Sequence, residues 1–193
     1  MKTTYEKIRS FIPDKYWWKK LLKNYNPEMN MQKEIDLMDI LKSNGIKNAV
    51  WALRCFDYWD YCLFLADVAE SVLPIFAKKH PEDDRPRKAI QAIRDYKDGK
   101  ITKQNLKEIA ISAYDAHDKA AYAAVYAASY VYNDADVAYT AYYTAEAAAE
   151  AYYDVNYIAV ANYSYADAFA SVARRKKWLD IEKLFIEHFG GEQ

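Results

Sequence analysis

Residues 120–132 read AAYAAVYAASYVY and residues 138–155 read AYTAYYTAEAAAEAYYDV, and both belong to the stretch that decides the fold, Ala110 to Ala173. This stretch holds 23 Ala and 13 of the chain's 19 Tyr, and it contains no Gly or Pro to interrupt a helix. Tyr recurs at four-residue spacing with Ala between, so each helix carries a small stripe beside an aromatic one. Small side chains let helix axes approach closely. The stretch therefore predicts long antiparallel Ala/Tyr-rich helices in an all-α multi-helix bundle.

Further helices are predicted on both sides of this stretch. Before it, apolar spacing indicates helices at 47–56 and 61–79, with Pro74 as a kink in the second. After it, a closing amphipathic helix is predicted from Trp178, Leu179, Ile181, Leu184, Phe185 and Phe189. The basic run 174–177 at its start is expected to be a solvated helix turn.

Residues with known cap preferences mark the helices between these two regions. Asp84 is placed to cap a helix that Gly99 ends, because Asp accepts from free backbone N–H groups and Gly tolerates the left-handed conformation. Thr102 is then expected to begin the next helix. No stretch alternates apolar and polar residues as a strand would.

The first 45 residues are predicted to form a helical hairpin. An early helix ends near Phe11, a second follows Pro13, and a third is expected from Pro27 to Asn44. We expect one helical domain over residues 1–193, with 1–45 as the N-terminal hairpin and 46–193 as the core.

Net charge is −1, but it is unevenly distributed. Residues 1–100 hold 19 Lys/Arg against 15 Asp/Glu, and residues 101–193 hold 8 against 13. An acidic body repels a phosphate backbone, so general nucleic-acid binding is not expected. Residues 1–9 lack the apolar segment of a signal peptide, and the longest uncharged run in the Ala/Tyr stretch, 120–133, is too short to span a membrane. We expect a cytoplasmic protein.

Three stretches of the middle region resemble a known family. They are WALR at 51–54, ADVAESVLPIF at 66–76 and PEDDRPRKAIQAIRDYKDGKIT at 81–102, followed by an Ala/aromatic helical tail and a basic amphipathic helix. The chain here is similar to the prokaryotic and phage immunity-protein family related to the immunity proteins of polymorphic toxin systems. The resemblance implies a non-enzymatic protein of genetic conflict, in the bacterial host cytoplasm if a phage encodes it.

The first turn of a predicted helix contains three basic residues, Arg85, Arg87 and Lys88. The helix dipole favours negative side chains at this position, so we expect a negatively charged group to neutralise the three positive charges. Neighbouring carboxylates could hold them as part of the fold. Alternatively they bind an anion such as a phosphate together with the helix N-terminus. Arg54 and Arg94 are candidates to join either cluster.

Aromatic residues surround Arg54 in the sequence. Trp51, Tyr58 and Trp59 could stack on a base, or they could simply belong to the core. Together with the basic residues they define a candidate ligand site for a small nucleotide signal.

The hydroxyl groups of so many Tyr cannot all be buried without partners. Some are therefore expected at a surface that binds protein, and the candidates are Tyr126, Tyr139, Tyr143 and Tyr153. Ala-faced helices with Tyr stripes also leave apolar surface that a symmetric homo-oligomer would bury.

Catalysis, a metal and a cofactor are not expected. His117 lies between Asp115 and Asp118, but no nucleophile motif accompanies it. The Glu-x-x-His pairs of helical-bundle metal sites do not occur, and Glu146 and Glu150 are interpreted as solvated. Cys55 and Cys62 are seven residues apart on one apolar stretch and are interpreted as buried hydrophobic side chains.

The sequence thus leads to two hypotheses. The first is a binding protein that neutralises a protein toxin or immune effector by tight association. The second is a phage anti-defence sponge that sequesters a nucleotide-derived immune signal, a cyclic oligonucleotide or an ADP-ribose derivative, without cleaving it.

Overall fold

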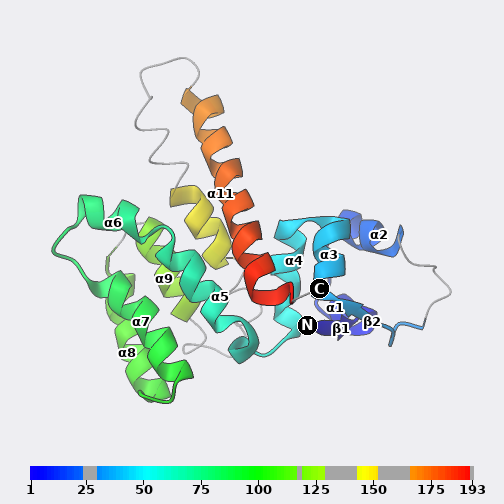
Figure 1. The fold of residues 1–193 in the computed structure, drawn as a ribbon, viewed down its shortest axis with the longest axis horizontal. Helices are drawn as coiled ribbons and strands as arrows, with labels where there is room; N and C mark the ends of the chain where they lie inside the picture. The colour runs from blue at the N-terminus through cyan, green and yellow to red at the C-terminus, as the bar shows by residue number, and fades with distance from the viewer. Residues whose placement is uncertain (24–29, 117–118, 129–142, 152–165, 192–193) are drawn as a thin grey trace.

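The computed structural model describes residues 1–23, 30–116, 119–128, 143–151 and 166–191 (Figure 1). Within these ranges the chain is almost wholly helical, and the strands are limited to one two-stranded sheet. The predicted all-α fold class is therefore confirmed. No helix in the described ranges is both long enough and apolar enough to cross a membrane.

The N-terminal unit combines short helices with the small sheet. Its elements are β1 (Lys2–Thr4), α1 (Tyr5–Ser10), α2 (Lys15–Lys23), β2 (Glu34–Asp36) and α3 (Leu37–Asn44). The helix predicted from Pro27 to Asn44 was wrong over residues 30–36, because β2 pairs antiparallel with β1, with Thr3 opposite Ile35. Residues 27–29 lie outside the described residues. The helix begins only at Leu37, where the Asp36 side chain accepts from the backbone N–H of Met38.

A chain of short helices leads from this unit into the core: α4 (Ile46–Ala52), the 3₁₀ turn η1 (Leu53–Cys55), α5 (Tyr58–Glu70) and α6 (Leu73–Lys79). The single kinked helix predicted over 61–79 is two helices. Pro74 does not kink a continuous helix but stands in the first turn of α6, where its missing N–H costs nothing.

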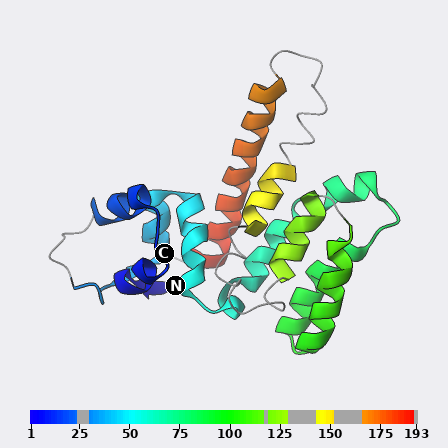
Figure 2. The same cartoon turned by 180° about the vertical axis from the view of Figure 1, so that it is seen from behind.

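Three helices then pack against one another: α7 (Arg85–Lys97), α8 (Lys103–Tyr114) and α9 (Lys119–Ala128) (Figure 2). Of these, α7 and α9 also pack against α5. The helix boundaries are as predicted, with Asp84 before α7 and Gly99 in the left-handed region at φ 72° after it. The predicted capping bond of Asp84 was wrong: its side chain accepts from no backbone N–H of α7 and pairs with Lys88, while Asp83 Oδ1 accepts from the backbone N–H of Arg85. Thr102 forms a capping box with Asn105, in which each side chain bonds the other residue's backbone N–H.

The described part of the Ala/Tyr stretch has the predicted small stripe. Ala123, Ala124 and Ala127 of α9 are fully buried, as are Ala145 and Ala148 of the helix at 143–151. The predicted turns at 133–134 and 154–156 lie outside the described residues.

Helix α11 (Ala166–Phe189) closes the fold and runs beside the helix at 143–151 (Figures 1 and 2). Its C-terminal half packs on α5, where the Phe185 ring lies 5.6 Å from Phe64 and 4.8 Å from Phe189 between ring centroids. Trp178 and Ile181 are buried as well, but Leu179, expected on the apolar face, is exposed.

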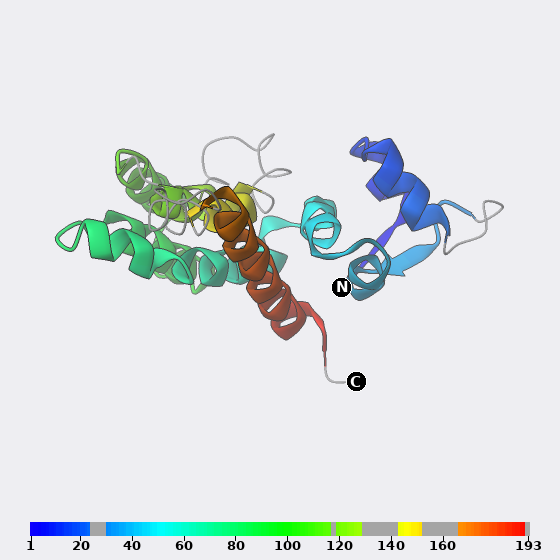
Figure 3. The ribbon, with the colours of Figure 1, turned by 90° about the horizontal axis from the view of Figure 1, so that it is seen from above.

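The N-terminal unit lies at one end of the molecule, with α4 between it and the other helices (Figure 3). Trp17 of α2 packs on Trp51 of α4 with 4.4 Å between ring centroids. The buried Asn44 side chain donates to the backbone oxygen of Trp17 at 3.0 Å, which fixes α3 against α2. The ring contact therefore joins the unit to α4, and the buried hydrogen bond joins two helices within the unit.

The capping box of Thr102 and Asn105 predicts how much the start of α8 contributes to stability. Thr102→Ala should lower the free energy of unfolding by about 1 kcal/mol, because it leaves a backbone donor of α8 without its partner. Thermal denaturation should show a melting temperature lower by about 2–4 °C for a chain of this size. Thr102→Ser keeps the hydroxyl and should retain most of the stability. Equal losses in the two variants would mean that the cap does not hold α8.

Candidate functional site

The cations at the start of α7 are held by the carboxylates of the preceding turn. Arg85 binds Asp83 with two bonds, Nε to Oδ1 at 2.9 Å and Nη2 to Oδ2 at 2.6 Å. These bonds lower the pKa of Asp83 to about 2. Lys88 pairs with Asp84 at 2.9 Å. For Arg85 and Lys88 the geometry therefore matches the hypothesis that neighbouring carboxylates hold these cations as part of the fold. Arg87 is exposed to solvent.

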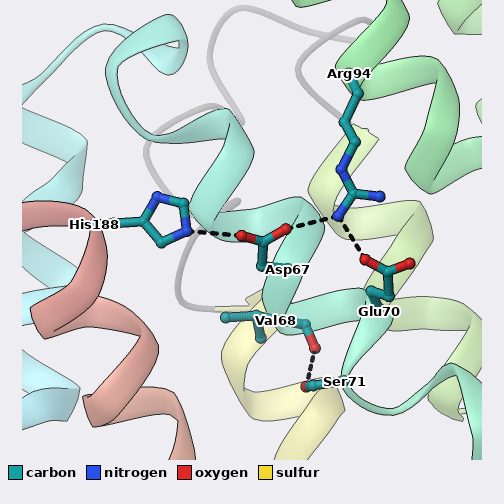
Figure 4. A network of polar contacts seen from close by, with 6 residues as sticks. All are labelled: Asp67, Val68, Glu70, Ser71, Arg94 and His188. Atoms are coloured by element: carbon teal, nitrogen blue, oxygen red, sulfur yellow. Dashed lines mark hydrogen bonds and ion pairs between the residues drawn. The ribbon is translucent and has the colours of Figure 1, made fainter.

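Arg94 lies farther along α7 and joins that helix to α5. Its Nη2 lies 2.6 Å from Asp67 Oδ1 and 2.6 Å from Glu70 Oε2 (Figure 4). Burial lowers the pKa of Arg94, but the bonds to both carboxylates outweigh it and raise the pKa. Asp67 also contacts His188 of α11, with 2.8 Å between Oδ2 and Nε2. Asp67 thus connects three helices that are distant in sequence.

Arg54 lies apart from these cations, in η1. Its guanidinium is buried against the face of Trp51 at 3.8 Å from the ring centroid, with Phe11 at 6.0 Å. Arg54 Nε donates to the backbone oxygen of Trp51 at 2.9 Å. Arg54 and Trp51 are therefore brought together as predicted, but their contact lies inside the junction between α4 and the N-terminal unit.

The other two aromatic candidates also face protein. Tyr58 is buried, and its hydroxyl donates to the backbone oxygen of Ala127 in α9 at 2.7 Å. Trp59 is half-buried beside Tyr96, with 4.7 Å between ring centroids, and its backbone oxygen accepts from Lys97. Both contacts fix α5 against its neighbours.

The predicted ligand site is therefore divided in the structure. Arg54 and Trp51 lie in the α4 junction, Arg85 and Lys88 at the start of α7, and Arg94 in its middle on α5. Nine residues separate Arg85 from Arg94, which is about 13 Å along a helix. The predicted cations and aromatic rings are thus distributed over three separate places in the fold.

Sequence reasoning missed an ion-pair network that joins α4, the helix at 143–151 and α11. Arg174 pairs with Glu146 at 2.8 Å and with Glu150 at 2.7 Å, and Glu146 also pairs with Lys47 at 2.9 Å. The interpretation of both glutamates as solvated was wrong. Their spacing of one helical turn beside a later basic run was the available signal, because it puts both carboxylates on one face.

Lys177 was also expected in a solvated turn and is instead buried. Its Nζ donates to Ser71 Oγ at 2.6 Å, and burial lowers the pKa of Lys177. Of the basic run 174–177, only Arg175 and Lys176 are exposed. Two residues of the run therefore stabilise the fold: Arg174 attaches α11 to the helix at 143–151, and Lys177 attaches it to Ser71 at the end of α5.

An aromatic surface crosses α8, α9 and the helix at 143–151. Consecutive ring centroids lie 6.0 Å apart for Tyr114 and Tyr122, 6.3 Å for Tyr122 and Tyr126, and 5.6 Å for Tyr126 and Tyr143. Tyr114 and Tyr143 are exposed, at 55% and 47%, and Ile111 is exposed one turn before Tyr114. Burial, and then the neighbouring Tyr rings, raise the pKa of Tyr126.

These four tyrosines, with Ile111, form what we call the tyrosine surface. Two predicted surface residues, Tyr126 and Tyr143, belong to it. Tyr139 and Tyr153 lie outside the described residues, as does His117. In the described ranges no three His, Cys, Asp or Glu side chains are grouped as metal ligands.

The two thiols are buried. Burial raises the pKa of Cys55 to about 11 and also raises that of Cys62. Both positions therefore favour the protonated, unreactive thiol.

Comparison with known protein families assigns the chain to one of them. A family described as "Imm-5 like putative immunity protein" matches residues 60–178, more than half of the chain. The chain belongs to this immunity-protein family, which confirms the resemblance seen at 66–76 and 81–102. The match begins after the motif at 51–54. No curated protein and no solved structure matches the chain.

Membership of this family indicates a conflict-related binding role for the chain. The tyrosine surface and the network around Asp67 both lie largely within the matched residues. The N-terminal unit and the Arg54–Trp51 contact lie before them.

Arg94 and Arg87 offer a matched pair for testing the structural role of the α7 cations. Arg94→Ala should lower the free energy of unfolding by about 1–2 kcal/mol, because two carboxylates lose their partner at a partly exposed site. Arg87→Ala removes an exposed side chain and should change stability by no more than about 0.5 kcal/mol. Chemical denaturation measures both, and equal effects would contradict the role assigned to Arg94.

The thiols provide a second test. Neither Cys55 nor Cys62 should react with Ellman's reagent at pH 8 in the native protein, because both are buried and protonated. After denaturation in guanidinium both should react at the rate of a free thiol. Rapid reaction of either thiol in the folded chain would show that α5 or η1 is open to solvent.

Proposed function

We propose that this chain is a non-enzymatic binding protein that neutralises a protein toxin or immune effector by tight association through the tyrosine surface. The observation that carries the proposal is the unbroken row of ring contacts from Tyr114 to Tyr143, exposed at both ends and flanked by Ile111. Tyr is enriched at protein interfaces because it buries a large area and loses few rotamers on binding.

The position of this surface supports the proposal. Tyr114, Tyr122 and Tyr143 come from three helices, each packed through buried Ala, so the rings are held in place before a partner arrives. A preorganised surface loses little entropy on association, and that favours tight binding. All the residues of the surface also lie within 60–178, the range that defines the family.

The alternative, a sponge for a nucleotide-derived signal, has less support from the described contacts. It needs cations and stacking faces in one pocket. Arg85 is held by Asp83, Arg94 by Asp67 and Glu70, and Tyr58 points its hydroxyl at a backbone oxygen. A phosphate would have to compete with each of these carboxylates.

The experiment begins with the protein that copurifies with the chain in stoichiometric amount from producing cells. Expressed alone, that partner should arrest growth, and coexpression of the chain should restore it. Tyr114→Ala and Tyr143→Ala should each weaken the complex by about 2 kcal/mol, the usual cost of truncating an aromatic residue that contributes strongly to binding. Calorimetric titration measures the affinity, and circular dichroism should be unchanged because both side chains are exposed.

Tyr16→Ala is the matched control, because Tyr16 is 78% exposed but belongs to α2 in the N-terminal unit. It should leave the affinity unchanged. A partner that does not affect growth, or one that binds equally well to all three variants, would refute the proposal. A thermal-shift screen against cyclic oligonucleotides and ADP-ribose derivatives tests the sponge, since a ligand at 100 times its Kd stabilises by about 2.7 kcal/mol.

A further inference from the structure

Helix α2 presents a solvent face made of four lysines and one tyrosine. The exposed residues of this helix are Lys15, Tyr16, Lys19, Lys20 and Lys23, and the opposite side is buried through Trp17 and Leu21. None of the four lysines pairs with a carboxylate among the residues that the structure describes. Arg85 and Arg174, by contrast, are held by acids of the chain itself. The positive charge of α2 is therefore available to a ligand.

The described acidic groups near α2 do not neutralise this face. Asp14 precedes the helix, and its Oδ1 accepts from the backbone N–H groups of Tyr16 and Trp17. Asp39 of α3 stands one turn before Ser43. The four lysines of α2, with the exposed Lys42 of α3, outnumber these two carboxylates, so an excess of positive charge remains. Lysines one helical turn apart repel each other, and a bound anion relieves that repulsion.

A hollow of about 400 Å³ lies on this face, where α2 packs on α3. It is lined by Tyr16, Lys19, Lys20 and Lys23 of α2 and by Ser43 of α3. The described lining thus contains three ammonium groups, an aromatic ring and a hydroxyl, and it contains no carboxylate. A volume of roughly 300–1,000 Å³ is usual for small-molecule sites. We call this feature the α2 hollow, and its charge and size fit a small anion.

The lining residues indicate two parts of that anion. Lys23 follows Lys20 by three residues and Lys19 by four, so neighbouring side chains leave the helix about 5–6 Å apart. Ammonium groups at this spacing can reach two adjacent phosphate groups. Tyr16 stands one turn before Lys19 and Lys20, is 78% exposed and contacts no other ring among the described residues. Its free ring face is suited to stacking on a planar base.

We propose that the α2 hollow binds a nucleotide with two or more phosphate groups. The phosphates contact Lys19, Lys20 and Lys23, and the base stacks on Tyr16. These residues differ from the ones predicted for a nucleotide site, which are divided among separate places in the fold. A single nucleotide occupies only the hollow, so the acidic residues of the distant helices are screened from it.

The α2 hollow is separate from the tyrosine surface. Helix α2 lies at the opposite end of the molecule from α8 and α9 (Figure 1). The hollow also lies before residues 60–178, the range that matches the family. Nucleotide binding is therefore a property of the N-terminal unit, in addition to the protein binding proposed above.

Calorimetric titration of the full chain with ADP, pyrophosphate and adenosine tests the two parts of the site. ADP should bind at one site per chain with a Kd on the order of 100 µM, because the lysines are exposed to water and salt. Pyrophosphate should bind about fivefold more weakly, since it has no base to stack on Tyr16. Adenosine alone should show no binding. Absence of ADP binding at millimolar concentration overturns the proposal.

Substitutions on one helix locate the bound nucleotide. Lys20→Ala and Lys23→Ala should each weaken both ADP and pyrophosphate about fivefold, the upper range for an exposed ion pair. Tyr16→Ala should weaken ADP about fivefold and leave pyrophosphate unchanged. Lys15→Ala is the matched control, because Lys15 is exposed on α2 but does not line the hollow. Equal weakening by Lys15→Ala and Lys23→Ala would mean that ADP senses only the charge of the helix, which contradicts the site.

Two further measurements separate this site from other partners. Lipid headgroups also carry phosphate, so cosedimentation with phosphatidylglycerol vesicles is measured in parallel. Binding to vesicles without binding of ADP would assign the lysines to a lipid surface and overturn the nucleotide proposal. Tyr16→Ala should retain full affinity for the protein partner of the tyrosine surface, so each proposal can fail without the other. All the variants change exposed residues, and circular dichroism verifies that they remain folded.

Discussion

Burial of helix α5 is the interaction on which the rest of this structure depends. Tyr61, Phe64 and Leu65 are almost wholly excluded from water, and α6, α7, α9 and α11 all contact this helix. Burying each large side chain stabilises the fold by roughly 1.5–3 kcal/mol. To exclude water from these side chains on several sides, the neighbouring helices must approach α5 closely. The small Ala side chains of α9 permit that approach. Its backbone comes near enough for the Tyr58 hydroxyl to reach the oxygen of Ala127.

The polar residues of α5 complete the same arrangement. Asp67 and Glu70 lie where α5 meets its neighbours, and they orient Arg94 of α7 and His188 of α11 (Figure 4). Carboxylates that would otherwise lose hydration are thus satisfied by the Arg94 guanidinium and a ring nitrogen of His188, which come from two packed helices. For function, this means that the Arg85 and Arg94 side chains of α7 are already paired with carboxylates of the chain itself. The surface that α8 and α9 share with the helix at 143–151 is instead formed by tyrosine rings.

The parts of this structure that could be predicted from the sequence are those determined by nearby residues. Gly99 and Thr102 end and begin helices where expected, because caps act within a few residues of themselves. The pairing of β1 with β2 was missed, since residues 2–4 meet 34–36 and neither segment alternates. Arg94 was identified as a candidate cation, but its partners on α5 come from packing that no local pattern encodes.

The candidate site shows the same limit. Trp51 and Arg54 are close in sequence and were correctly grouped, yet their environment depends on Phe11 and on Trp17, which arrive from the N-terminal unit. Two members of the tyrosine surface, Tyr126 and Tyr143, were named as surface candidates from the Tyr content of the chain, whereas Tyr114, Tyr122 and Ile111 were not. Its continuity required knowing that α8, α9 and the helix at 143–151 lie side by side.

Helix α4 explains how a unit outside the family-matching range becomes part of one molecule. It receives Trp17 on one side, while its Lys47 pairs with Glu146 and lies 4.7 Å from the Trp178 ring centroid on the other. Glu146 in turn holds Arg174 of α11. The N-terminal unit therefore attaches where α11 and the helix at 143–151 meet, away from the tyrosines that connect α8 to α9.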